Sequence, residues 1–393
     1  MHIKQTSHLR FYIYLAALFM TLGASLVSYT NSSFLAQIGG TQNVGLVYIV
    51  ASVISLVLFL VWPDILKTIR LKTSLVILGL GATGALLLLA TAPESLSANL
   101  VLFLAFYATA PLLRYSLDLY LENFSTDKLT GSIRGLFMTI INTACLVSPL
   151  VAGFILDGQD RYELVYGASA LALIPFLLLL FKFKTVEIPK SYTKPVRLPW
   201  SIFWRPKNQH EDDLRHILSI DFILNFFYAL MVVYTPLYLH QVIGFSWNQI
   251  GIIFTIMLLP FVLIEYPLGL WSDRKVGEKE IIVTGLTLMA FATTLIIFLP
   301  PGNIALWATV LCLTRFGAAA VEIAKETYLF KKIKHEDSSI LSLSRMSISL
   351  SYIIGPLFVG LFLTIFDFKF LFAALGLVVL SGLYFAYHLV DTA

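Results

Sequence analysis

Long hydrophobic segments recur about every 30 residues along this chain, and each could cross a membrane. A spanning helix needs about 20 mostly apolar residues, because the hydrocarbon core of a bilayer is about 30 Å thick. Backbone N–H and C=O groups in that core must be paired within the protein, which leaves helices or closed barrels. The segments lack the polar alternation of barrel strands, and 58% of the chain is hydrophobic while 13% is charged. The sequence therefore predicts an all-α integral membrane protein.

Twelve such segments can be placed on the sequence. They lie near 11–35, 44–62, 73–91, 98–121, 133–156, 163–183, 216–240, 248–271, 281–300, 303–330, 340–366 and 368–390. The only extended polar stretch separates the first six from the last six. We expect an N-terminal six-helix bundle at residues 1–183, a cytoplasmic linker at 184–214 and a C-terminal six-helix bundle at 215–393.

The second half faintly repeats the first at an offset of roughly 204 to 209 residues. The matching segments, in order, are FLAQ at 34–37 with YLHQ at 238–241, the runs leading to Gly45 and Gly251, DLYL at 118–121 with ETYL at 326–329, and Ser148-Pro149 and Gly153 with Gly355-Pro356 and Gly360. Because the echoes keep one order and nearly one offset, they predict two pseudo-symmetric halves. Paired membrane halves usually enclose a substrate path between them.

Basic residues predict the orientation, since loops rich in Lys and Arg stay in the cytoplasm. With a cytoplasmic N-terminus, twenty-one of the 27 Lys and Arg residues fall in cytoplasmic segments, and only Arg161 and Lys369 fall in opposite loops. We therefore expect a multi-pass protein of the cell membrane with both termini cytoplasmic. Anionic lipid of the inner leaflet accounts for the net charge of +4, so no nucleic-acid partner is indicated.

The loop after the eighth predicted span carries the most specific motif. Residues 269–279 read GLWSDRKVGEK, which resembles the signature G-x-L-[AS]-D-R-x-G-[RK]-[RK] of the major facilitator superfamily. One extra residue precedes Gly277, Trp271 replaces a leucine, and Glu278 replaces a basic residue. The matching loop of the first half, LVWPD at 60–64, keeps only the acid and a following basic run.

This resemblance implies a fold of two six-helix bundles and a latch on the inner side. Gly269 would let helices approach, and Asp273, followed by Arg274, would accept hydrogen bonds from the start of span eleven near Arg345. Asp64 would do the same at span five near Arg134. The alternative is that these loop charges only enforce the topology.

A proline motif in span five resembles a second family pattern. ACLVSPLVAG at 144–153, with Ser148, Pro149 and Gly153, is similar to the motif G-x-x-x-G-P-x-x-G-G of drug:proton antiporters, with small residues replacing three glycines. Span eleven carries Gly355, Pro356 and Gly360 in the equivalent place. The motif therefore indicates either the drug-efflux branch or a packing device common to both halves.

Ionisable residues inside the spans are the candidates for chemistry, because each is costly to hold in hydrocarbon unless it faces a cavity or a partner. The candidates for the cavity and for coupling are Arg114, Asp118, Arg315, Glu322, Glu326 and Asp221, with Asn31 and Asn225 as polar wall residues. Lys325 in span ten and Glu265 in span eight are also ionisable, and we expect Glu265 to pair with a neighbouring helix through Arg345. Asp221 could instead cap or snorkel, and an asparagine in a span often only joins two helices.

The family resemblance places spans one, four, seven and ten around a central cavity, so Arg114 and Glu322 would face one another. We expect Glu322 and Asp118 to exchange protons as this pair breaks and reforms. The alternative is that both acids snorkel or latch the inner gate.

These features predict a monomeric secondary transporter that works by alternating access. Proton-coupled export of small amphipathic or drug-like molecules is the leading hypothesis. The alternative is proton-coupled uptake of a sugar or small organic anion, because Arg114 and Arg315 suit an anionic solute. A non-transporting membrane sensor or an intramembrane enzyme is the alternative of another class. No nucleotide-binding glycine loop and no metal-ligand spacing of His or Cys is present, so we expect no cofactor and no metal.

Overall fold

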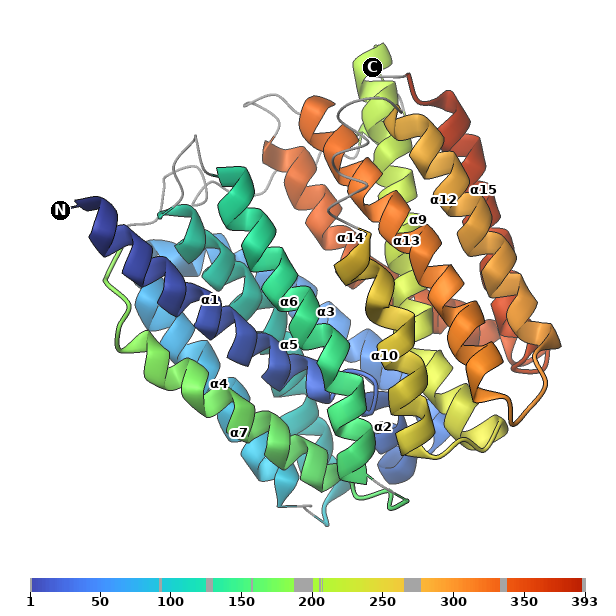
Figure 1. Cartoon of the computed structure of the whole chain (residues 1–393), viewed down its shortest axis with the longest axis horizontal. Coiled ribbons are helices and arrows are strands. Elements are labelled where there is room, and N and C mark those ends of the chain that lie inside the picture. Colours follow the sequence, from blue (N-terminus) through green and yellow to red (C-terminus); the bar gives the residue numbers. More distant parts are fainter. Residues whose placement is uncertain are drawn as a thin grey trace. The chain divides into compact units, whose positions relative to one another are not determined.

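The computed structural model describes residues 2–91, 94–124, 130–156, 158–186, 201–204, 206, 208–264, 277–332 and 338–390. These residues form helices joined by short connections, and no strand occurs among them. The chain divides into two compact units, Met1–Pro195 and Val196–Ala393. Each unit is an assembly of long helices (Figure 1). Most of the predicted linker lies outside the described residues.

The helices of the N-terminal unit are α1 (His2–Leu26), α2 (Asn31–Gly39), α3 (Thr41–Thr68), α4 (Leu71–Ala90), α5 (Leu96–Glu122), α6 (Thr130–Leu156) and α7 (Tyr162–Leu180). Those of the C-terminal unit are α8 (Ser201–Trp204), α9 (Gln209–Leu237), which continues as a π-helical turn (Tyr238–Val242), α10 (Trp247–Leu263), α12 (Glu278–Leu295), which ends in a 3₁₀ turn (Ile296–Phe298), α13 (Ile304–Lys332), α14 (Ser338–Phe362) and α15 (Phe370–His388).

Every predicted span coincides with helix over most of its described residues, which confirms the all-α membrane fold. Eleven helical segments among the described residues are long and apolar enough to cross a membrane. The shorter apolar helix α10 supplies the first part of the eighth predicted span. The first predicted span consists of two helices, α1 and α2, which meet at a turn where the Thr30 hydroxyl donates to the Val27 carbonyl oxygen at 3.1 Å.

Helices pack in the same order inside each unit. In the N-terminal unit α1 contacts α5, α6 and α7, α5 contacts α3 and α4, and α4 contacts α7. In the C-terminal unit α9 contacts α13, α14 and α15, α13 contacts α10 and α12, and α12 contacts α15. One pattern becomes the other when each helix is replaced by its sequence-repeat counterpart. The echoes in the sequence thus correspond to one six-helix arrangement built twice.

Two equivalent side chains fasten the end of the sixth span in each unit. Lys72 Nζ donates to the Phe183 carbonyl at 2.7 Å, and Tyr120 Oη donates to the Lys184 carbonyl at 2.9 Å. Lys279 Nζ and Tyr328 Oη do the same for the carbonyls of Leu389 and Val390, at 3.0 and 2.8 Å. Tyr120 and Tyr328 belong to the DLYL and ETYL echo, so this echo reflects a shared tether.

The proline motifs have counterparts in α6 and α14. Ser148 is fully buried beside the buried Pro149 and Gly153, and its hydroxyl donates to the Ala144 carbonyl at 2.7 Å. In α14, Pro356 is buried, and a Cβ added to Gly355 would lie 2.5 Å from Leu230 Cδ1 on α9. A Cβ on Gly360 would meet nothing within 4 Å. Close packing is therefore seen at Gly355 and not at Gly360.

A close backbone approach that depends on glycine lies between α12 and α13. A Cβ on Gly317 would lie 2.5 Å from the Gly285 carbonyl oxygen, and a Cβ on Gly285 would lie 2.9 Å from the Gly317 carbonyl oxygen. Backbone cannot move aside as a side-chain tip can. These two glycines therefore set the distance between α13, which carries Arg315 and Glu322, and its neighbour α12.

We expect Gly317→Ala to lower the free energy of unfolding in detergent by about 1–3 kcal/mol, because the methyl group overpacks a backbone contact. Gly81→Ala on α4 is the matched control, since a Cβ there meets nothing within 4 Å. Its helix propensity should make the control neutral or more stable by about 0.5–1 kcal/mol. Equal stability of the two variants would contradict the close approach.

Candidate functional site

Polar side chains from α9, α13 and α14 meet inside the C-terminal unit. Asp221 of α9 is 2% exposed and forms an ion pair with Lys325 of α13, which is 8% exposed. The Ser344 hydroxyl of α14 donates to the other Asp221 carboxylate oxygen at 2.9 Å. A buried charge is tolerated only when it is paired and hydrogen-bonded, and here both conditions are met. The alternatives that Asp221 caps or snorkels are wrong.

Asn225 extends this network by one helical turn. Its side-chain amide nitrogen donates to Asp221 Oδ1 at 3.1 Å and lies 3.3 Å from Ser347 Oγ. Asp221 and Asn225 are four apart on α9, and Ser344 and Ser347 are three apart on α14, so each pair shares a helix face. Asn225 thus joins two helices, which was the alternative to a role as a polar wall residue of the cavity.

Glu322 lies one turn before Lys325 on α13 and has a different environment. Its Oε2 accepts a hydrogen bond from the Tyr228 hydroxyl of α9 at 2.7 Å. Among the residues that the structure describes, no lysine or arginine forms an ion pair with this half-buried carboxylate. Glu326, one turn further, is exposed. Glu322 is therefore an acidic residue within a membrane span. Its carboxylate accepts a hydrogen bond from a hydroxyl group and forms no ion pair with a described residue.

Arg315 lies two turns before Glu322 on the same helix and is 1% exposed. Its guanidinium carbon lies 5.1 Å from the ring centroid of Phe227 and 5.3 Å from that of Tyr228. Its Nε and Nη1 atoms are buried, and neither has a hydrogen-bond partner in the described part of the chain. Aromatic faces attract the cation but accept no strong hydrogen bonds from its N–H groups. Arg315 is thus a buried cation with unused donors.

The candidates in the N-terminal unit are more dispersed. Arg114 on α5 is exposed, and its Nη2 lies 4.0 Å from Met138 Sδ on α6. Asp118, one turn later, is half-buried. Asn31 is buried and accepts a hydrogen bond from the Tyr166 hydroxyl at 2.8 Å, so it joins α2 to α7. The expected bridge between Arg114 and Glu322 would connect the two units and stays a prediction.

The expected inner latch falls mostly outside the described residues, which exclude Gly269, Asp273, Arg274 and the side chain of Arg134. Arg345 is half-buried on α14. Asp64 forms an ion pair at 2.5 Å with Lys67, three residues later in its own helix, and both side chains are exposed. Asp64 thus forms a local ion pair within its own helix, and the latch stays a prediction.

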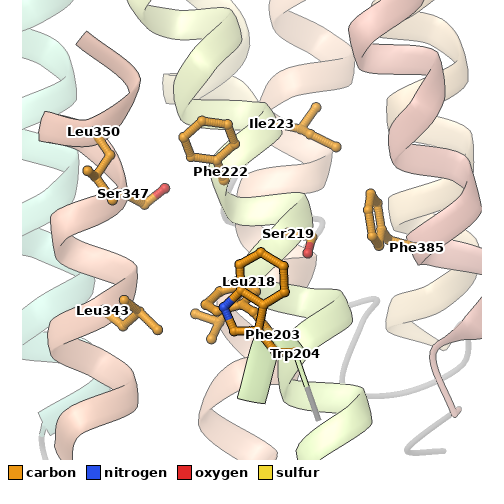
Figure 2. Close-up of a pocket in the computed structure, with 10 residues that line it drawn as sticks. All are labelled: Phe203, Trp204, Leu218, Ser219, Phe222, Ile223, Leu343, Ser347, Leu350 and Phe385. Atoms are coloured by element: carbon orange, nitrogen blue, oxygen red, sulfur yellow. The ribbon is translucent and has the colours of Figure 1, made fainter. Parts of the chain in front are cut away.

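An apolar groove of about 440 Å³ lies beside the polar network. Figure 2 shows Leu343, Ser347 and Leu350 of α14 on one side of α9 and Phe385 of α15 on the other, with Phe203 and Trp204 of α8 in front. Leu218, Ser219, Phe222 and Ile223 of α9 complete the lining. Ser347 belongs to both the groove and the Asn225 contact, so an apolar ligand in the groove would lie against the network.

Sequence reasoning did not assign four residues of this site, which are Lys325, Tyr228, Ser344 and Ser347. Lys325 was noticed only as an ionisable residue. Its positive charge, opposite to that of Asp221, was the feature of the sequence that could have indicated the pairing. Tyr228 looked like one aromatic residue among many. Serines in a span carry little signal by themselves because they often bond to their own backbone. No group of three or more His, Cys, Asp or Glu side chains suited to a metal occurs among the described residues.

Comparisons with known proteins agree with this architecture. A family model described as Major Facilitator Superfamily matches residues 13–249 and 245–392. The search of curated proteins found no match. Among solved structures, the chain resembles that of the human organic anion transporter MFSD10 (TETRAN), with a TM-score of 0.69, 14% identity, and coverage of 97% of this chain and 99% of that one. The family match spans nearly the whole sequence, and the chain therefore belongs to the major facilitator superfamily of membrane transporters.

Proposed function

We propose that this chain is a proton-coupled secondary transporter that moves small amphipathic solutes by alternating access. Membership of the superfamily supports transport. The observation that supports proton coupling is on α13, where neither Glu322 nor Arg315 forms an ion pair with a described residue. Two unpaired opposite charges within a membrane span are energetically costly. The cost falls when a proton neutralises the acid, an anionic solute pairs with the cation, or water solvates either group.

Glu322 is the proposed proton carrier. An ionised carboxylate is stable when its side of the transporter is open to water, and a protonated one is stable when the site is closed. The Tyr228 hydroxyl can donate to Glu322 when the acid is ionised and accept from it when the acid is protonated. Both protonation states therefore keep a hydrogen bond, which suits a group that must change charge during the cycle.

Asp221 and Lys325 have a structural role in this proposal. Their charges neutralise one another, and Ser344 and Asn225 occupy further positions on the carboxylate. This pair, with Ser344, joins α9, α13 and α14 beside Glu322. It is the fixed part of the site.

The groove supports an amphipathic solute, because its lining is almost entirely apolar while Ser347 links it to the polar network. In α14 the proline motif packs closely through Gly355, which agrees with a packing role for the motif in that half. Uptake of a small organic anion is the second candidate, and the unpaired Arg315 favours it. The related MFSD10 structure is of an organic anion transporter, but at 14% identity it contributes the fold alone.

Glu322→Gln should abolish solute movement driven by an imposed proton gradient, because the amide keeps the hydrogen bond with Tyr228 and cannot carry a proton. Exchange of labelled for unlabelled solute at equal pH should persist at near wild-type rate. Both are measured in proteoliposomes with the proton gradient imposed in each direction.

The matched control is Glu163→Gln, which removes an acid paired with Arg161 outside the proposed site. It should leave gradient-driven transport unchanged. Gradient-driven transport by Glu322→Gln at the wild-type rate would remove Glu322 from coupling, and no solute movement by the wild-type protein would favour a sensor.

Removing one member of the buried pair, by Asp221→Asn or Lys325→Met, should lower the free energy of unfolding by about 3–5 kcal/mol, because the other charge stays buried without a partner. The double variant should regain part of this loss. Removing the exposed pair Arg161 and Glu163 should change stability by about 0–1 kcal/mol. Unfolding in detergent at graded denaturant measures all of these, and a double variant as unstable as the sum of the single variants would contradict the pairing.

A further inference from the structure

We propose that Arg315 binds the anionic group of the transported solute, a carboxylate or a similar oxyanion, so that the natural solutes are amphipathic organic anions. This inference rests on the proposed function and names its substrate class. It starts from a cation that is 99% removed from solvent contact and has no anion partner in the described part of the chain.

The first step is that no described carboxylate forms an ion pair or a hydrogen bond with the buried Nε and Nη1 atoms of Arg315. Glu322 is seven residues further along α13, which is about 10 Å of helix rise, and its carboxylate accepts from Tyr228. Asp221 is paired with Lys325 and hydrogen-bonded to Ser344. Glu265 of the eighth predicted span lies outside the described residues. Among the described carboxylates of α9 and α13, none forms an ion pair with Arg315, so its charge is open to a ligand.

The second step is the shape of the surroundings. Phe227 and Tyr228 present ring faces to the guanidinium at 5.1 and 5.3 Å. Stacking of this kind holds the guanidinium plane and leaves its edges, which carry the N–H donors, for an oxyanion. Tyr228 is half-buried, so the part of its ring that the guanidinium does not cover offers apolar contact to the body of a ligand. A carboxylate joined to an apolar group fits both features, whereas a sugar or a cation fits only one or neither.

The third step is the charge balance of the site. The Asp221 and Lys325 charges cancel, and Glu326 is exposed, so Arg315 and Glu322 carry the remaining charges of the buried and half-buried side chains. When Glu322 is protonated, one positive charge remains, and a monoanion on Arg315 neutralises it. The proposed proton site and the proposed anion site therefore complement one another.

The test measures equilibrium binding to the full chain purified in detergent. Three probes share one apolar body and differ in charge, namely 4-phenylbutyrate, the neutral 4-phenylbutanamide and the cationic 4-phenylbutylamine. The midpoint of thermal unfolding is followed at rising concentrations of each probe. For the wild-type protein, only the carboxylate should raise the midpoint.

The variants locate the binding group. Arg315→Gln should weaken carboxylate binding by about tenfold or more, because charge-assisted hydrogen bonds are lost. Arg315→Lys, which keeps the charge and loses the planar donor set, should fall between the two. Arg161→Gln is the control, since Arg161 is exposed and already paired with Glu163, and it should bind the carboxylate like the wild-type protein.

Several results would overturn the proposal: stabilisation of the wild-type protein by the amide or the amine as strongly as by the carboxylate, no response to any of the three probes, or equal carboxylate binding by Arg315→Gln. The selectivity of the wild-type protein is measured without any variant, so a variant that does not fold leaves the test intact. Carboxylate binding without transport in proteoliposomes would retain the site and refute the proposed function. Transport with no preference for anions would retain the proposed transport function and refute the anion site at Arg315.

Discussion

In the hydrocarbon core of a membrane, a polar group is stable only when another polar group or water completes its hydrogen bonds. This constraint sorts the polar residues of the chain into two sets. Asn31 pairs with Tyr166 in the N-terminal unit, and Asp221 pairs with Lys325 in the C-terminal unit. Each pair joins two helices of its own unit. Arg315 and Glu322 carry charges that no described ion pair completes. The first set builds the scaffold, and the second set is where transport chemistry is proposed.

The fold could be predicted from the sequence because each span encodes itself locally. A run of about 20 apolar residues forms a helix in lipid, and each of the twelve predicted segments contains helix among its described residues. The repeat was also readable, since Tyr120 and Tyr328 occupy equivalent tethers in the two units. The signature loop identified the superfamily, which the family match confirms.

The partners in the site could be predicted only in part, because they depend on contacts between distant segments. Asp221 and Lys325 are 104 residues apart, and nothing in the local pattern of either span indicates the other. Tyr228 was noticeable only as an aromatic residue, although its hydroxyl contacts Glu322. Single residues stood out correctly as ionisable groups in spans, whereas their pairing required the packing of α9, α13 and α14. The Arg114 to Glu322 bridge is a prediction of the same distant kind.

Water access to α13 tests the central claim most directly. In a chain with Cys145→Ser and Cys312→Ser, single cysteines are introduced by Glu322→Cys and by Leu313→Cys, nine residues earlier and on the opposite face of the helix. A charged, membrane-impermeant thiol reagent is applied to proteoliposomes, and labelling is followed over time. The account predicts rapid labelling at position 322 and little at 313, because only the Glu322 face borders an aqueous path. Labelling at the same rate at positions 322 and 313, or no labelling at position 322, would contradict the account.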